Sequence, residues 1–121
     1  ILFLDEEKTL VKKYCVNSTS ILKEVGFSLL LYIEGFSTRI PIDYDLDELS
    51  VTFVAIPGPT LERVPESEYK HELDRLLQKL QQLGLEHCDK NPGNFVKDVI
   101  THEIGILDLE SVKYEPTKSP L

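Results

Sequence analysis

The chain has 121 residues, a length that suits one domain with a single hydrophobic core. Hydrophobic residues make up 41% and charged residues 28% of the sequence, which excludes a disordered or fibrous chain. The formal net charge of -8 excludes a generic nucleic-acid binder, because such binding depends on lysine and arginine displacing counterions from phosphates. A nucleotide site stays compatible with this charge, since a bound divalent cation supplies the positive charge that phosphates need.

The first elements predict a small antiparallel sheet with one helix. Ile1 to Leu4 and Lys8 to Tyr14 flank an acidic turn, a pattern typical of a hairpin. The hydroxyls of Ser18 to Ser20 favour a helix N-cap, and Gly35 suits a helix end, which predicts a helix from Ser20 to Glu34. Apolar residues recur within it at helical spacing: Leu22, Val25, Leu29 and Ile33.

A connector and a strand are expected next. Ser37 to Ser50 contain proline and acidic residues and suggest a connector without regular structure. Val51 to Ile56 form a short run of mostly apolar residues that predicts a buried strand, and Pro57 ends it. The longest apolar stretch of the chain, Leu29 to Ile33, is too short to span a bilayer, so we expect no membrane partner.

The second half predicts one long helix, a polar loop and a hairpin. Glu66 favours the positive end of a helix dipole, and Gly84 suits the cap at the other end. Between them lies one apolar stripe: Tyr69, Leu73, Leu76, Leu77, Leu80 and Leu83. Phe95 to Ile100 and Glu103 to Asp108 then predict two strands around a polar turn. The expected fold class is α+β.

The late hairpin places two oxygen-bearing side chains near each other. A turn near Thr101 pairs residues whose numbers sum to about 202, which sets Asn94 opposite Asp108. With Asp89 a few residues upstream, these groups predict a Mg²⁺ site, since Mg²⁺ prefers few protein oxygens plus waters and phosphates. Asn in a turn and Asp at a strand end are commonly structural, so the prediction depends on the combination.

Leu85 to Phe95 read LEHCDKNPGNF, and Ile106 to Glu110 read ILDLE. Together they resemble the catalytic loop and metal-binding segment of protein-kinase-like phosphotransferases. The shared pattern is His-x-Asp, an Asn five residues after the Asp, and a second Asp beyond a strand, a turn and a strand. Pro92 to Asn94 and the Asp-x-Glu ending resemble aminoglycoside phosphotransferases and small atypical kinases more than typical protein kinases.

The resemblance implies a role for each matching residue. Asp89 would orient or deprotonate a hydroxyl acceptor, and His87 would brace the loop. Asn94 and Asp108 would hold Mg²⁺ against the phosphates of ATP or GTP. Glu110 would add a second carboxylate or point at solvent.

Earlier residues fit the same template. Lys12 resembles the lysine that contacts phosphate, and Glu24 resembles its ion-pair partner. Lys13, on the opposite strand face, is an alternative, and a solvated edge-strand charge is an equal alternative for either lysine. Ala55 and Ile56 resemble the hinge whose backbone contacts adenine, with a plain core strand as the alternative.

The resemblance further implies a single kinase-like domain over residues 1–121, with a small lobe at 1–56 and a reduced large lobe at 57–121. No glycine-rich loop precedes Lys12, and no activation segment or further large-lobe helix follows Glu110, which predicts a truncated, degenerate or minimal relative. Such a chain would leave apolar surface bare, first on the long helix. A homo-oligomer or a bound protein partner is therefore expected.

The function predicted from these residues is Mg-nucleotide-dependent transfer of phosphate to a hydroxyl acceptor. The alternatives are an inactive, pseudokinase-like binding or regulatory module, and an unrelated acidic interaction domain. Cys15 and Cys88 lie far apart and no signal-peptide pattern opens the chain, so we expect reduced thiols in an intracellular, cytoplasmic protein.

Overall fold

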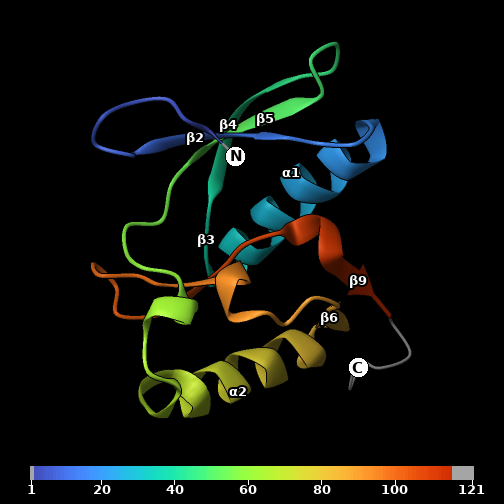
Figure 1. The fold of residues 1–121 in the computed structure, drawn as a ribbon. Coiled ribbons are helices and arrows are strands. Elements are labelled where there is room, and N and C mark those ends of the chain that lie inside the picture. The colour runs from blue at the N-terminus through green and yellow to red at the C-terminus, as the bar shows by residue number, and fades with distance from the viewer. Residues whose placement is uncertain (1, 116–121) are drawn as a thin grey trace.

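The computed structural model describes residues 2–115, so Ile1 of the predicted first strand lies outside the described residues. The fold is a mixed α+β arrangement in two parts, with α1 beside the upper sheet and α2 at the opposite end (Figure 1). The elements are β1 (Leu2–Phe3), β2 (Leu10–Tyr14), α1 (Ser18–Ile33), β3 (Ser37–Thr38), β4 (Ile40–Asp45), β5 (Ser50–Val54), η1 (Leu61–Arg63), α2 (Glu66–Gln82), β6 (Leu85–His87), η2 (Pro92–Asn94), β7 (Phe95–Lys97), β8 (Ile104–Ile106), η3 (Leu109–Ser111) and β9 (Val112–Tyr114).

The upper part is an antiparallel sheet in the order β1-β2-β5-β4 with α1 packed against it. The predicted first hairpin is confirmed, with Leu2 opposite Lys12. The predicted helix is also confirmed and begins two residues earlier, at Ser18, because the side chain of Asn17 caps the backbone N–H of Ser20. The core of this part consists of Val11, Ile21, Val51 and Phe53.

The predicted connector at Ser37 to Ser50 is wrong, because it contains β3 and β4. β4 lies at the edge of the upper sheet, where Pro41 is tolerated because an edge strand has backbone groups without ladder partners. Most of its side chains are exposed. An edge strand of this kind has no buried alternating face, so its sequence lacks the pattern by which strands are recognised.

The lower part contains the long helix and the late hairpin, both as predicted. α2 spans Glu66–Gln82, and Gly84 follows it with a φ of 77°, a backbone angle that suits glycine. β7 pairs antiparallel with β8, β3 adds to β8 in parallel, and β6 pairs with β9. Arg39 is the single residue between β3 in the lower sheet and β4 in the upper one, so the chain crosses between the parts there.

The apolar stripe of α2 is covered rather than bare. Tyr69 and Leu80 are buried, and the other stripe residues are half-buried against the lower core: Leu73, Leu76, Leu77 and Leu83. The expectation that this helix carries the uncovered apolar surface is therefore wrong. Exposed large apolar side chains gather instead on α1. Between residues 2 and 115, neither helix has the length and apolar character that crossing a bilayer requires.

Candidate functional site

The late hairpin pairs one residue away from the predicted register. Phe95 lies opposite Ile106, and the C=O of Asn94 accepts a hydrogen bond from the N–H of Leu107 at 2.8 Å. Asn94 is thus opposite Leu107, and Asp108 lies one residue beyond. The cause is Asp98, whose carboxylate accepts from the backbone N–H of Ile100 at 2.8 Å and draws the following residues into the turn. Both strands are therefore shorter than predicted.

Asp108 lies where three elements meet. It has a left-handed backbone, with φ 55° and ψ 59°, a conformation that Asp tolerates better than most residues. Leu109 then enters the core, while the Asp108 carboxylate faces Lys13 on β2 and accepts a hydrogen bond from the Ser111 hydroxyl at 2.8 Å. The aspartate is fixed from two sides.

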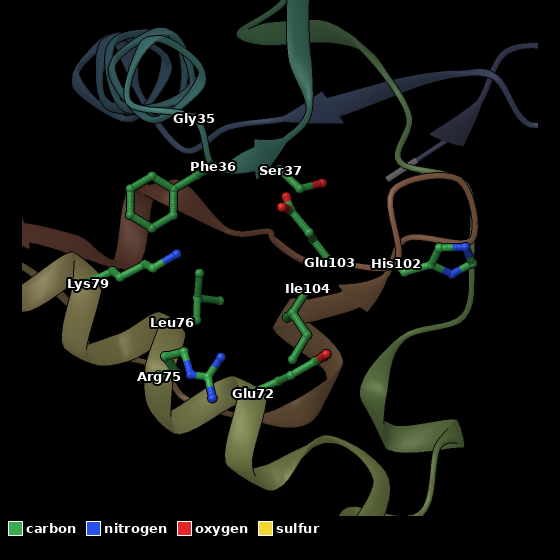
Figure 2. Close-up of a pocket in the computed structure, with 10 residues that line it drawn as sticks. All are labelled: Gly35, Phe36, Ser37, Glu72, Arg75, Leu76, Lys79, His102, Glu103 and Ile104. Carbon is green, nitrogen blue, oxygen red and sulfur yellow. The ribbon is translucent and has the colours of Figure 1, made fainter.

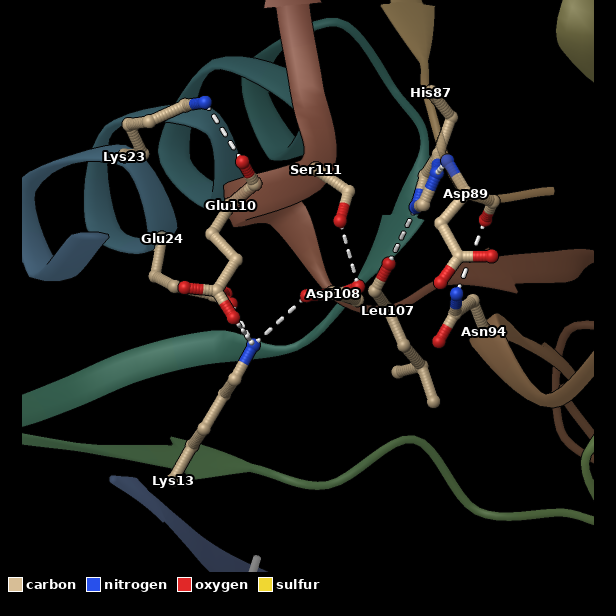
Figure 3. A network of polar contacts seen from close by, with 10 residues as sticks. All are labelled: Lys13, Lys23, Glu24, His87, Asp89, Asn94, Leu107, Asp108, Glu110 and Ser111. Carbon is tan, nitrogen blue, oxygen red and sulfur yellow. Dashed lines mark hydrogen bonds and ion pairs between the residues drawn. The ribbon is translucent and has the colours of Figure 1, made fainter. Parts of the chain in front are cut away.

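Lys13 contacts all three carboxylates of a cluster (Figure 3). Its Nζ atom pairs with Glu24 of α1, with Asp108 Oδ1 at 3.1 Å and with Glu110 Oε1 at 3.3 Å. The Glu24 side chain is only 4% exposed and that of Lys13 12%, whereas Asp108 and Glu110 are 23% and 30% exposed. These four side chains carry an excess of two negative charges at a partly shielded position.

The pKa values of Lys13 and Asp108 are shifted in the directions that favour their charged forms. Burial alone would lower the pKa of Lys13, but attraction by Glu24 and Asp108 outweighs it and raises that pKa above its ordinary value. Burial alone would raise the pKa of Asp108, but hydrogen bonds from Ser111 and Lys13 outweigh it and lower that pKa. Both groups are therefore charged near neutral pH.

The predicted pairing of Lys12 with Glu24 is wrong, and the alternative lysine makes that ion pair. Lys12 Nζ lies 3.1 Å from Glu48 on the other face of the sheet. Side chains alternate along a strand, and Lys13 shares its face with Val11, which packs in the core with α1. Only the Lys13 face of β2 reaches Glu24.

His87 connects the polar loop to the late hairpin. Its ring is 1% exposed, its Nε2 atom lies 2.9 Å from the C=O of Leu107, and its Nδ1 atom lies 3.2 Å from the N–H of Asp89. These two contacts tie the buried His87 ring to the loop at Asp89 and to the hairpin at Leu107.

Asp89 and Asn94 lie on the other side of Asp108 from Lys13 (Figure 3). The Asn94 Nδ2 atom donates to the C=O of Asp89 at 3.0 Å, which ties the two ends of the loop together. Asp89 is exposed, and its Oδ1 atom accepts from the N–H of Asn91 at 3.3 Å.

The residues of the predicted hinge, Ala55 and Ile56, already contact other parts of the chain. The N–H of Ala55 donates to the C=O of Thr9 at 2.8 Å. The Ile56 side chain lies against Gly105, where an added Cβ would come within 2.5 Å of its Cδ1 atom. A purine base at this position would therefore depend on backbone groups other than the Ala55 N–H.

The donor set of the cluster fits a divalent cation that prefers oxygen. Glu24, Asp108 and Glu110 each offer a carboxylate oxygen, and these atoms lie within 4.8 Å of one another. Mg²⁺ commonly binds one or two carboxylates together with substrate phosphates. The Lys13 ammonium contacts the same three carboxylates, so a cation there would share them with it.

Sequence reasoning missed two residues of this site. Ser111 holds Asp108, and Lys23 of α1 donates to the C=O of Glu110 at 2.7 Å. The spacing of Ser111, three residues after Asp108, is a common local hydrogen-bonding pattern and was the available signal. No sequence pattern indicated Lys23, because the contact of α1 with η3 is a tertiary contact.

Two pockets lie away from this cluster. One, of about 210 Å³, is lined by residues 35–37 after α1, by α2, by the β7 to β8 turn and by the start of β8, and no predicted site residue lines it (Figure 2). The other, of about 190 Å³, lies between α2 and β6 and reaches His87. The carboxylate cluster lines neither of these two pockets.

The chain has a kinase-like α+β fold. Two of the solved structures that are similar to it serve as examples. The first is the Rio2 kinase-ADP/Mg²⁺-phosphoaspartate complex from Chaetomium thermophilum, at TM-score 0.63 and 24% identity over 78% of this chain and 31% of that one. The second is monomeric WbdD, at TM-score 0.62 and 20% identity over 80% of this chain and 25% of that one.

The chain spans about a third or less of the length of these neighbours. No protein-family model matches the sequence, and no curated protein matches it. At these identities the likeness concerns the fold alone.

Proposed function

We propose that the protein is a kinase-like phosphotransferase that uses a Mg-nucleotide to transfer phosphate to a hydroxyl acceptor. The observation that carries this proposal is the contact of one lysine, Lys13, with both Glu24 and Asp108 in a kinase-like fold. Each of these residues comes from a different element, so their convergence is a property of the folded chain. The Rio2 kinase neighbour, crystallised with ADP and Mg²⁺, supports the same ligands here.

The roles follow from charge and position. Lys13, in place of Lys12, contacts nucleotide phosphate, and Glu24 orients its ammonium group. Asp108 binds Mg²⁺, with Asn94 or Glu110 as a further oxygen ligand. The ion supplies charge neutralisation for the phosphates when bound. Ala55 and Ile56 flank the base.

Asp89 is the proposed contact with the acceptor. In the transfer, the bond from the γ-phosphorus to the bridging oxygen breaks, a bond to the acceptor oxygen forms, and the acceptor proton passes to Asp89 or to solvent. The exposed carboxylate of Asp89 and the bracing by His87 suit this role. Positioning and charge neutralisation account for most of the catalysis in such reactions, so a site without a covalent nucleophile suffices.

Binding of the nucleotide is testable by its effect on stability. ATP or GTP with Mg²⁺ at about 100 times the dissociation constant should add about 2.7 kcal/mol to the free energy of unfolding. Asp108→Asn should abolish the Mg²⁺-dependent part of this shift, while Asp74→Asn, an exposed change on α2, should retain it. Differential scanning fluorimetry measures both. A wild-type protein without any nucleotide shift at millimolar concentrations would contradict the proposal.

Transfer itself needs a second measurement. Asp89→Asn should bind Mg-nucleotide as the wild type does, yet release no ADP in the presence of a hydroxyl acceptor. Full turnover by this variant would contradict the role of the carboxylate.

A catalytically inactive binding or regulatory module is the second candidate. The observation that favours it is that the cluster is satisfied internally: Lys13 contacts three carboxylates, and the Ala55 N–H is already bonded to Thr9. Such a module would gain stability on binding the nucleotide but would not hydrolyse it or transfer its phosphate.

Two broader expectations accompany the proposal. Residues 1–121 form one domain with lobes at 1–56 and 57–121, joined through the Lys13 cluster. An intracellular, cytoplasmic location would supply millimolar nucleotide and Mg²⁺.

A further inference from the structure

The larger of the two pockets takes its lining from three separate stretches of the chain: residues 35–37 after α1, the helix α2, and residues 102–104 at the end of the β7 to β8 turn (Figure 2). Its volume of about 210 Å³ is below the range of about 300 to 1,000 Å³ that is typical of sites for drug-sized ligands. The pocket therefore fits a smaller molecule. It contains no residue of the proposed phosphotransferase site.

The inner part of the pocket is apolar. Phe36, Leu76 and Ile104 line it, each from a different stretch of the chain. Ile104 is buried, and the other two are half-buried and pack against the lower core. The core thus holds these side chains in place, and a small apolar group would be removed from water by packing on them.

Two basic side chains of α2 lie at the rim of the pocket. Arg75 and Lys79 are exposed and one helical turn apart, which places them on the same side of the helix. Among residues 2–115, neither forms an ion pair with a carboxylate, although the sequence has 21 acidic residues and 13 basic ones. A guanidinium group can bind a carboxylate through two parallel hydrogen bonds. The rim on α2 therefore suits a ligand carboxylate.

Glu103 supplies a negative charge at another part of the rim. Its carboxylate points toward Ser37, and the basic side chains of α2 come from the other side of the pocket (Figure 2). Within the described part of the chain this carboxylate has no ion-pair partner. Glu72, the second carboxylate of the lining, is already paired with Lys97 at 2.8 Å. Glu103 is thus the acidic group that suits a ligand ammonium.

These charges restrict the chemistry of the ligand. Glu103 would repel a multiply charged anion such as a phosphate ester, and Arg75 and Lys79 would repel a purely cationic molecule. A molecule with one carboxylate, one ammonium and an apolar group has a partner for each of its parts. An α-amino acid carries both charged groups on one carbon atom, so its apolar side chain can enter the pocket while its charges stay at the rim.

We propose that this pocket binds a free α-amino acid with an aliphatic side chain of about the size of leucine. The carboxylate pairs with Arg75 and Lys79, the ammonium pairs with Glu103, and the side chain packs on the apolar lining. The inference is independent of the proposed phosphotransferase function. Ion pairs at an exposed rim contribute little, so the expected dissociation constant is about 0.1 to 1 mM.

A titration of the wild type with L-leucine, followed by its amide chemical shifts in nuclear magnetic resonance spectra, measures this binding. The shifts should saturate below about 20 mM ligand. They should centre on residues 35–37 and 102–104, and the signals of Lys13 and Asp108 should stay unchanged.

Three analogues test the parts of the ligand on the wild-type protein. Isocaproate is leucine without its ammonium group, isoamylamine is leucine without its carboxylate, and glycine lacks the side chain. Each should bind at least about tenfold more weakly than L-leucine, because each loses one of the three contacts.

Two variants assign the contacts to residues. Arg75→Gln combined with Lys79→Gln should weaken L-leucine at least about tenfold and should not weaken isoamylamine. Glu103→Gln should weaken L-leucine and should not weaken isocaproate. Lys70→Gln is the matched control, because Lys70 is exposed on the same helix and outside the pocket lining, and it should leave the affinity within about twofold.

Four results would overturn the inference. The first is a wild type without saturable shifts at about 20 mM L-leucine, and the second is a set of shifts centred on the Lys13 cluster. The third is isocaproate or isoamylamine binding as tightly as L-leucine. The fourth is full affinity for L-leucine in the variant that lacks both basic side chains.

Discussion

At the scale of the residue, the two neighbouring lysines of β2 pair with carboxylates that differ in burial. Lys12 pairs with a partly exposed Glu48, and exposed ion pairs contribute little stability. Lys13 is the cation beside Glu24, a carboxylate with almost no solvent contact. Removing Lys13 therefore takes the ion-pair partner from a buried carboxylate, which is the costly case.

Lys13→Met should lower the free energy of unfolding by about 2 to 3 kcal/mol, and Lys12→Met should lower it clearly less, because its ion pair is exposed. Urea denaturation monitored by circular dichroism measures both. Glu24→Gln should cancel much of the cost of Lys13→Met, because no buried carboxylate then remains unpaired. Equal costs for the two lysine variants would contradict the assignment of Lys13 to the cluster.

At the scale of the element, the segment between β5 and η1 joins the two parts of the molecule. The C=O groups of Pro57 and Pro59 accept from the N–H groups of Val99 and Lys97, each at 2.9 Å, so the segment runs beside β7. Gly58 lies between them with a φ of 141°, and a Cβ there would lie 1.9 Å from the C=O of Lys97. The backbone of β7 leaves no space for a side chain.

Gly58→Ala should therefore lower the Tm by about 10 °C or more, since the clash is with backbone and the φ angle is strained for alanine. Thermal unfolding at low protein concentration measures the shift. Gly26→Ala is the matched control, because the same change in open helical space should raise the Tm by a few degrees. A wild-type Tm for Gly58→Ala would show that this segment moves away from β7 at little cost.

At the scale of the whole molecule, the carboxylate cluster joins the two parts. Lys13 and Glu24 come from the upper part, whereas Asp108 and Glu110 follow β8 in the lower one. The folded protein lowers the pKa of Asp108 below its ordinary value of 3.8. The ionised form of Asp108 therefore stabilises the fold above about pH 3.8, and this contribution is lost as the pH falls through the depressed pKa.

Asp108→Asn should be less stable than the wild type near pH 7, by up to about 1 kcal/mol because the site is partly solvated. Asparagine also tolerates the left-handed backbone at this position, so the change isolates the charge. The two Tm values should converge as the pH falls from about 5 to about 2.5. Parallel Tm curves across that range would show that the Asp108 charge does not stabilise the fold.

The sequence by itself determined the elements with strong local patterns. The leucine spacing of α2 and the apolar run of β5 each follow from local geometry, and the structure contains both. The helix α1 was also predicted, but its N-cap is Asn17 and not one of the hydroxyl residues Ser18 to Ser20. The His-x-Asp and ILDLE segments likewise indicated a kinase-like fold, because that motif depends on close spacing along the chain.

Only the tertiary structure decided which side chains meet. Lys13 rather than Lys12 faces Glu24 because the pairing of β2 with β5 sets the face that α1 covers. Asn94 lies opposite Leu107 because Asp98 tightens the turn. The exposure of the edge strand β4 and of the apolar side chains on α1 depends on which surfaces the neighbouring elements cover. Local sequence determines backbone preference. It does not determine strand register or which surfaces become covered, since both arise from contacts between residues far apart in the chain.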